Sequence, residues 1–266
     1  MSEAPPLSRE DAYRVFASVL GTDAVLVGGQ AVAFWAELYL DQGRLPELDR
    51  GTGIYVSRDV DFLGGEREAE ACARVLDGKV YVQDRPWDSP PVSAAQVQFV
   101  DGAAYKRIVD FLINVCGVQS AEEVRDCAAA FDVEDSSEPL YVMDPVTCLR
   151  TRLANIRALG RRDAKSLQQA RLSVWIAREW LIDRADPAVG GQRDALRRIE
   201  SVFRYARHHD DTQHAALHHG IEAFDAIVPN EALPERFRAQ RYPQMQRIIA
   251  TDRARRRLAR QGGRAS

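Results

Sequence analysis

Residues 24–40 read AVLVGGQAVAFWAELYL, a short apolar run followed by two glycines and a segment with helical composition and spacing. The run at 24–27 predicts a buried strand, and Gly28-Gly29 predicts a tight turn into a helix over 30–40. Such a turn brings backbone N–H groups close to an anion, with the positive end of the helix dipole behind them. The stretch therefore suits a triphosphate, although two glycines after a strand also simply make a tight turn.

A second segment, RDVDFLG at 58–64, carries two acidic residues in a strand pattern. Alternate strand residues project in the same direction, so Asp59 and Asp61 share a face and can hold one or two Mg²⁺ ions. Because two nearby carboxylates repel each other, a cation or a basic neighbour is expected between them. The alternative is a surface strand whose aspartates are only solvated.

A third acidic residue, Asp110, lies within the apolar run IVDFLINV at 108–115, where an unpaired charge would be costly. Metal coordination would neutralise it, and so would a buried ion pair with an arginine. Lys106 stands four residues earlier on the same strand face, where it could approach a phosphate or balance the carboxylates.

The rest of the first half also mixes helices and strands. Ser8 and Ser120 each precede an acidic residue by three positions, which is typical of a helix-capping box. Residues 41–57 are rich in Gly, Asp and Pro and predict a loop. We expect the other elements of this half to be helices over 8–21 and 66–77 and strands over 79–83, 95–100, 105–115 and 140–142.

Asp144-Pro145 is a typical helix start, with the aspartate as cap and the proline in the first helical position. Everything beyond it has helical patterning, so the chain divides into 1–143 and a mostly helical 144–266. We expect helices near 145–159, 163–182, 193–208, 212–226 and 242–260.

The composition restricts location and partners. The formal net charge of −3 argues against a protein coated in positive potential. No apolar run is long enough to span a membrane, and the first residues do not resemble a signal peptide, so we expect a cytoplasmic protein without a membrane partner. The cysteines lack metal-ligand spacing and are expected to be reduced core thiols: Cys72, Cys116, Cys127 and Cys148.

One strongly basic segment lies at the end of the chain. It could attract nucleic acid, or it could be a solvated, frayed terminal helix. Its cations are Arg253, Arg255, Arg256, Arg257, Arg260 and Arg264.

All the histidines lie within HHDDTQHAALHH at 208–219. His214 and His218 have the i,i+4 spacing that can chelate Zn²⁺ from one helix face. The segment lacks the glutamate of the zinc-protease pattern, however, and a polar exposed helix surface explains it more simply.

Taken in order, LVGGQAVAFW, RDVDFLG and VDFLINV resemble the nucleotidyltransferase superfamily, whose core is a strand, a Gly-Gly or Gly-Ser turn, a helix, Asp-x-Asp and a third acidic strand residue. The resemblance is greatest to the bacterial branch related to abortive-infection (AbiEii-like) and toxin–antitoxin nucleotidyltransferases. It implies an α+β fold, with a mixed sheet flanked by helices as catalytic core at 1–143. A helical domain with a basic C-terminal tail would follow at 144–266.

The resemblance also implies an activity, the transfer of a nucleoside monophosphate from a nucleoside triphosphate to an acceptor. Asp59, Asp61 and Asp110 would bind Mg²⁺ or Mn²⁺, and Gly28 and Gly29 would position the phosphates. Lys106 is a further nucleotide-binding candidate. In the basic segment after the core, the resemblance suggests contacts to triphosphate or acceptor from Arg150, Arg152, Arg157, Arg161, Arg162 and Lys165.

The acceptor and the biological setting stay open at this point. RNA, especially a tRNA 3′ end, is the first expectation and a protein hydroxyl the second, in a toxin–antitoxin or phage-defence system with a cognate antitoxin. A small-molecule nucleotidyltransferase of the aminoglycoside type is the alternative enzyme. A non-catalytic nucleotide-binding or antitoxin-like module is the alternative without turnover.

Overall fold

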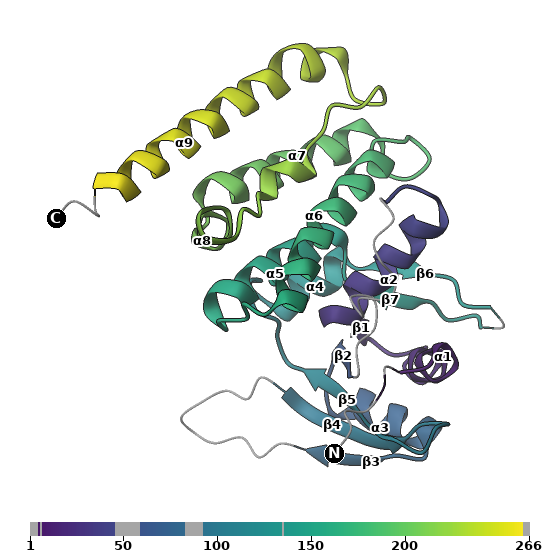
Figure 1. Cartoon of the computed structure of the whole chain (residues 1–266). Coiled ribbons are helices and arrows are strands. Elements are labelled where there is room, and N and C mark those ends of the chain that lie inside the picture. Colours follow the sequence, from purple (N-terminus) through teal and green to yellow (C-terminus); the bar gives the residue numbers. More distant parts are fainter. Residues whose placement is uncertain (1–4, 6, 46–58, 83–92, 135, 263–266) are drawn as a thin grey trace. The chain divides into compact units, whose positions relative to one another are not determined.

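The structure is a computed structural model that describes residues 5, 7–45, 59–82, 93–134 and 136–262 (Figure 1). The chain forms two compact units, Met1–Thr151 and Arg152–Ser266. The division lies within helix α5 (Pro145–Ala158), whereas the expected boundary at 143/144 precedes that helix. Most of the loop expected at 41–57 lies outside the described residues.

The first unit is built on a seven-stranded mixed sheet in the order β3-β4-β5-β2-β1-β7-β6. The β2–β5 and β1–β7 pairs are parallel and the other pairs are antiparallel. The α+β class expected from the sequence is therefore confirmed. The strands are β1 (Val25–Leu26), β2 (Val60–Leu63), β3 (Lys79–Val82), β4 (Ser93–Val100), β5 (Lys106–Leu112), β6 (Ala129–Phe131) and β7 (Leu140–Val142). The helices before α5 are α1 (Arg9–Ala17), α2 (Gly28–Asp41), α3 (Glu66–Leu76) and α4 (Ala121–Cys127).

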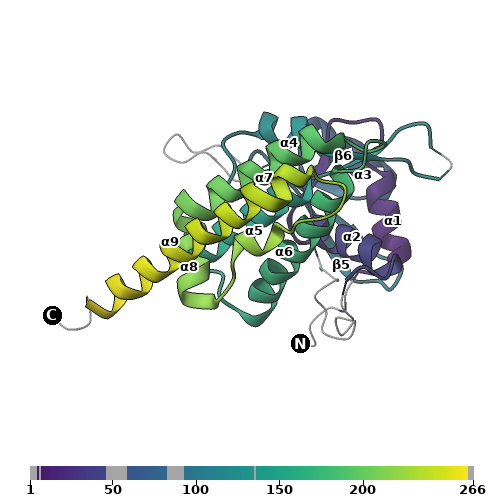
Figure 2. The same ribbon diagram turned by 90° about the horizontal axis from the view of Figure 1, so that it is seen from above.

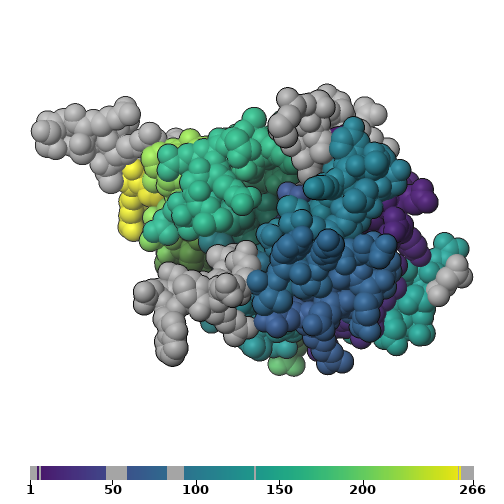
Figure 3. All heavy atoms as spheres, turned by 90° about the horizontal axis from the view of Figure 1, so that it is seen from below, coloured from purple at the N-terminus to yellow at the C-terminus, as the bar shows by residue number. Residues whose placement is uncertain are grey.

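One face of the β2–β5 region is apolar and buried. Phe62 and Phe111 stack there with ring centroids 5.7 Å apart, and α3 packs against β4 and β5. The space-filling view in Figure 3 shows the part of the chain that contains α3 and β3, in blue, gathered into one continuous surface of the first unit. Because strand residues alternate, the residues between the buried ones emerge on the opposite face. That opposite face carries the acidic residues.

A polar contact also fixes α3 in the first unit. The hydroxyl of Ser18 lies 3.1 Å from the thiol of Cys72, which joins the turn after α1 to α3. Both side chains are buried, and the Ser18 hydroxyl also donates to the carbonyl oxygen of Val15 over 2.6 Å, so it is satisfied without water.

Local sequence signals explain where several elements begin. The hydroxyls of Ser8 and Ser120 accept the N–H groups of Asp11 and Glu123, as expected of N-caps. Asp144 accepts the N–H groups of Val146 and Thr147 at the start of α5. These caps satisfy amide groups that have no acceptor within the helix, and so they set the first residue of each helix.

The second unit consists almost entirely of helices. They are α6 (Ala164–Arg184), α7 (Gly191–His208), α8 (Asp210–His219), a short 3₁₀ helix (Ala223–Ala226), a π-helical turn (Phe237–Arg241) and α9 (Tyr242–Gly262). Figures 1 and 2 show α9, in yellow, lying beside α7 and extending beyond it. Ion pairs from Arg207 to Asp252 and from Arg241 to Glu200 join α9 and the turn before it to α7. Among the described residues, no helix is both long and apolar enough to cross a membrane.

The structure differs from the sequence expectation at two elements. Strand β6 was not expected; it pairs with β7, and its Phe131 packs edge-on against Phe34 and Trp35 of α2. The single helix expected over 212–226 is also wrong. Gly220 adopts φ of +64°, which ends α8 at His219, and the chain then forms the separate 3₁₀ helix.

Candidate functional site

The sheet register brings the carboxylates of two distant segments together. On the parallel pair β2 and β5, Asp61 lies directly opposite Asp110, and on the next strand Gln96 lies opposite Asp110. Neighbouring strands are about 4.8 Å apart, so these three side chains form one polar row on the face of the sheet opposite Phe62 and Phe111. Asp61 and Asp110 are half-buried, and Asp59 is exposed just before β2 begins. The row of Asp61, Asp110 and Gln96, with Asp59 beside it, is called the acidic row below.

Asp110 is held by a neutral partner. The Nε2 of Gln96 donates a hydrogen bond to Oδ1 of Asp110 over 2.7 Å. Burial raises the pKa of Asp110, the hydrogen bond from Gln96 lowers it, and the negative charge of Asp59 raises it; the net change is upward. Asp110 therefore lies in a place where a cation would relieve both desolvation and repulsion.

Gly28 places the backbone of α2 directly against Asp61. Gly28 is the first residue of α2 and has φ of +68°, a conformation that L side chains rarely adopt. A Cβ atom at this position would overlap Oδ2 of Asp61 and would stand 3.0 Å from both Cβ and Cγ of that residue. The glycine is needed here for backbone conformation and for space. Both glycines belong to the helix itself, which was expected to begin at residue 30.

The first turn of α2 adds favourable electrostatics for an anion. The first amide groups of a helix have no acceptor within it, and the helix dipole is positive at that end. Gly29 follows Gly28 in this turn, while Val27 provides no side-chain cap. Carboxylates and helix amides are therefore neighbours, an arrangement that can bind a metal–phosphate complex through both of its charges.

Lys106 is on the expected face but far from the acidic pair. It begins β5, is exposed and lies opposite Val100. It lies four positions before Asp110 along β5, a distance of about 13 Å between Cα atoms. Lys106 therefore cannot neutralise Asp110 directly. Of the two roles expected for it, only contact with a phosphate of an extended triphosphate remains.

The basic residues after the core have varied surroundings. Arg150 pairs with Glu123 in the first unit, Arg152 donates to Gln169, and Arg157 pairs with Asp210 and Asp211 in the second unit. These three arginines have structural partners. Arg161 and Lys165 are exposed in the second unit, Arg161 in the connection after α5 and Lys165 in the first turn of α6.

Comparisons with known proteins do not name a family. No family model matches the chain, and no curated protein matches it. Among solved structures it is similar to the crystal structure of JHP933 from Helicobacter pylori, with 13% sequence identity and a TM-score of 0.38. The alignment covers 97% of this chain and 99% of that chain. The function is therefore inferred from this chain's own residues.

The oxygen atoms of the acidic row are ligands of the type that a hard divalent cation prefers. Among the residues that the structure describes, no group of three acidic, histidine or cysteine side chains is arranged as a complete metal site. Mg²⁺ commonly binds proteins through one or two carboxylates and completes its shell with water and substrate phosphates. Asp61 and Asp110 provide two such carboxylates on neighbouring strands. They fit a cation that arrives with its phosphate ligand.

Gln96 is a site residue that was not identified from the sequence. The available signal was the alternation of Gln96 and Gln98 with buried Val97 and Phe99, which puts both amides on the polar face. That alternation does not indicate which strand lies beside β4, so the contact with Asp110 could not be predicted.

Three rings of the histidine segment form a cluster. His214 and His218 have ring centroids 4.5 Å apart, and His219 lies 5.7 Å from His214. Burial lowers the pKa of both His214 and His219, and the electrostatic effects of neighbouring His218 and Arg162 lower it further. The same positive surroundings would oppose a bound cation, and none of the described residues completes a metal-binding group there.

Proposed function

We propose that this protein is a Mg²⁺- or Mn²⁺-dependent nucleotidyltransferase whose chemistry takes place at the acidic row of the first unit. The observation that carries the proposal is the position of Asp61, which lies beside Asp110 in the sheet register and against Gly28 at the start of α2. The pairing of carboxylates with helix-terminal amides suits a nucleoside triphosphate and its metal.

In the proposed reaction, a hydroxyl oxygen of the acceptor attacks the α-phosphorus of a nucleoside triphosphate. The bond from that phosphorus to the bridging oxygen breaks, pyrophosphate leaves, and the hydroxyl proton passes to a base. The divalent cation, when bound, neutralises the phosphate charge that develops during transfer. Such transfer depends mainly on alignment and charge neutralisation, which are the two things these residues can provide.

Each residue has a distinct proposed role. Asp59 and Asp61 hold the cation, and the amides of Gly28 and Gly29 hold the β- and γ-phosphates. Asp110 completes the cation site and accepts the proton of the acceptor hydroxyl, a role favoured by its raised pKa. Gln96 positions Asp110 through the hydrogen bond to its Oδ1.

Lys106, Arg161 and Lys165 are proposed as contacts for the triphosphate or the acceptor, because all three are exposed cations. The proposed acceptor is RNA, first a tRNA 3′ end and then, as a different class, a protein hydroxyl. The basic part of α9 supports RNA, since Arg255 is exposed and Arg256 half-exposed there. A toxin–antitoxin or phage-defence role, with an antitoxin that blocks the transfer, is the proposed setting.

Incorporation of α-³²P label tests the activity. Each nucleoside triphosphate would be incubated with total RNA and cell protein, with Mg²⁺ or Mn²⁺, and with wild type, Asp61→Asn or Asp110→Asn. Asp126→Asn is the matched control, because Asp126 is an exposed aspartate on α4 outside the acidic row.

We expect label in one acceptor class with wild type and Asp126→Asn, and at least about a hundredfold less with the other two variants. Label transfer that persists at the wild-type rate in Asp61→Asn would refute the assigned site. Triphosphate binding without transfer to either acceptor class would favour a small-molecule acceptor or a binding module.

A further inference from the structure

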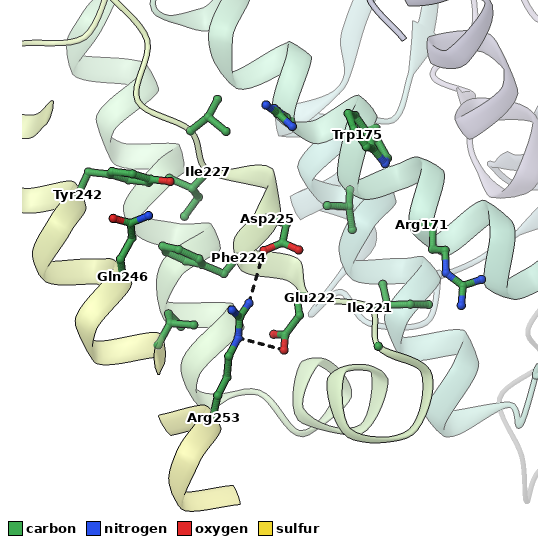
Figure 4. A pocket seen from close by; sticks show the side chains of 15 residues that line it. Arg171, Trp175, Ile221, Glu222, Phe224, Asp225, Ile227, Tyr242, Gln246 and Arg253 are labelled. Atoms are coloured by element: carbon green, nitrogen blue, oxygen red, sulfur yellow. Dashed lines mark hydrogen bonds and ion pairs between the residues drawn. The ribbon is translucent and has the colours of Figure 1, made fainter. Parts of the chain in front are cut away.

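The second unit contains a cavity of about 550 Å³ that the proposed transfer reaction does not use. It is lined by α6, by residues 220–228 and by α9 (Figure 4). Its size is within the range of about 300–1,000 Å³ typical of small-molecule sites. The wall combines aromatic rings, aliphatic side chains and three arginines, so its charge and its apolar surface both need an explanation.

Arg178 is the group that most needs a ligand. Its Nε is buried and has no hydrogen-bond partner, and no ion pair to Arg178 occurs among the described residues. Its guanidinium lies over the ring of Trp175, 5.3 Å from the centroid. Most other arginines of this unit whose guanidinium is part-buried have carboxylate partners: Arg184, Arg198, Arg207, Arg241 and Arg253. A half-buried guanidinium without a carboxylate partner is a typical place for an anion.

The remaining charges of the cavity leave a positive excess. Arg253 reaches from α9 to Glu222 and Asp225, at 3.0 and 3.4 Å, and neutralises part of their charge (Figure 4). Arg171 donates to the carbonyl of His219, which leaves its charge unmatched by any carboxylate that the structure shows beside it. Three arginines therefore face two carboxylates, and the surplus lies on α6.

The cavity also provides a surface for a flat ring. Trp175 remains 40% exposed although it lines the cavity, and it lies between Arg171 and Arg178 on one face of α6. Phe224 and Tyr242 stack with centroids 6.2 Å apart and interplanar angle 11°, and they form an adjoining aromatic wall. Exposed aromatic faces beside arginines favour nucleobases, since every base can stack on them.

We infer that this cavity binds a nucleoside phosphate, with the phosphate at Arg178 and Arg171 and the base against Trp175. Glu222, Asp225 and Gln246 provide acceptors for ribose hydroxyls or base amino groups at the opposite wall. The chemistry is the same for a free nucleotide and for the terminal nucleotide of an RNA strand. The inference rests on the second unit alone and does not depend on the transferase proposal.

Binding would be measured with the full chain by equilibrium dialysis and tryptophan fluorescence. The probes are the four nucleoside 5′-monophosphates, adenosine, inorganic phosphate and a trinucleotide of RNA. The variants are Arg178→Gln, Arg178→Lys, Trp175→Ala and Trp175→Phe. Arg204→Gln is the matched control, because Arg204 is an exposed arginine of α7 that does not line the cavity.

We expect a monophosphate or the trinucleotide to bind at least about tenfold more tightly than adenosine or inorganic phosphate. Arg178→Gln and Trp175→Ala should each weaken that binding about tenfold, while Trp175→Phe and Arg204→Gln should leave it nearly unchanged. Binding of the trinucleotide alone would identify the ligand as an RNA end. Asp61→Asn should retain the binding, which separates this cavity from the proposed catalytic row.

Equal affinity in Arg178→Gln and wild type would overturn the inference, as would no binding of any phosphate-bearing probe. A similar loss in Arg204→Gln would also overturn it, because it would show unspecific attraction to positive charge. If circular dichroism shows that Arg178→Gln does not fold, the affinities of Arg178→Lys and Trp175→Ala are compared with wild type instead. Wild-type affinity in both variants would overturn the inference.

Discussion

Replacing Gly28 by alanine should damage the acidic row through two separable effects. The first is conformational, because Gly28 has φ of +68° and an L residue in that region costs about 1–2 kcal/mol. The second is steric, because the new Cβ would overlap Oδ2 of Asp61 and crowd its Cβ and Cγ at 3.0 Å. Moving Asp61 out of its rotamer adds about 0.5–1.5 kcal/mol. The expected total loss of unfolding free energy is about 1.5–3.5 kcal/mol.

Gly43→Ala separates these effects. Gly43 has almost the same φ, +67°, and follows the end of the same helix, but a Cβ there would meet nothing within 4 Å. It should cost only the conformational part, about 1–2 kcal/mol. Urea unfolding of both variants, followed by circular dichroism, measures the difference, and label transfer should fall sharply in Gly28→Ala alone.

A double variant tests the contact itself. Asp61→Ala removes the carboxylate that the new Cβ would overlap, so Gly28→Ala should cost about 1 kcal/mol less in that background than in wild type. If Gly28→Ala and Gly43→Ala are equally destabilising, and the double variant shows no coupling, then Asp61 does not lie against α2 and the proposed site loses its basis.

Three further predictions concern titratable groups. Asp110→Asn should raise the unfolding free energy at pH 7 by less than about 1 kcal/mol, because the raised pKa of Asp110 means that the folded state disfavours the charged carboxylate. Urea unfolding measures this gain, which should vanish below about pH 4, where Asp110 is protonated in both states. The pKa of His214 is lowered in the folded state, so as pH falls this histidine is protonated in the unfolded state before it is protonated in the folded state. The melting temperature should therefore drop between about pH 7.5 and 5.5. His214→Asn should reduce that drop, whereas His208→Asn, at an exposed histidine, should not. Burial raises the pKa of Cys72 to about 11, so Ellman's reagent at about pH 8 should leave this thiol unmodified in the folded protein. The reagent should modify the half-buried Cys116 and Cys127. Fast reaction of Cys72 would contradict its burial.

The hydrogen-bond partner of Asp110 could not be identified from the chemistry of the residues alone. The sequence left two solutions for this buried acid, a metal or an arginine, and the structure adds a third, the amide of Gln96. Arg107, three residues before Asp110 on β5, instead forms a buried ion pair with Asp101 at 2.5 Å, on the other face of the strand. Strand alternation predicts these opposite faces, but it does not identify the neighbour on the next strand.

What the sequence determined by itself was local. The alternation in D-V-D and the cap residues Ser8, Ser120 and Asp144 each act over a few residues, so they predicted strand β2 and the starts of three helices. The Gly28-Gly29 pair was expected as a turn before the helix, but it forms the first residues of α2. The strand at Ala129–Phe131 was missed because it is short and depends on pairing with β7. Its existence is a property of the sheet more than of its own residues.

Only the tertiary structure decided which distant residues meet. The β2–β5 register puts Asp61 beside Asp110, and the packing of α6 against 220–228 and α9 leaves Arg178 in a cavity without a carboxylate partner among the described residues. Both outcomes follow from burying apolar faces that are far apart in the chain, such as those of Phe62 and Phe111. Apolar burial is not directional, so a pattern in the sequence shows which face is buried, whereas strand order and helix packing determine what lies opposite it.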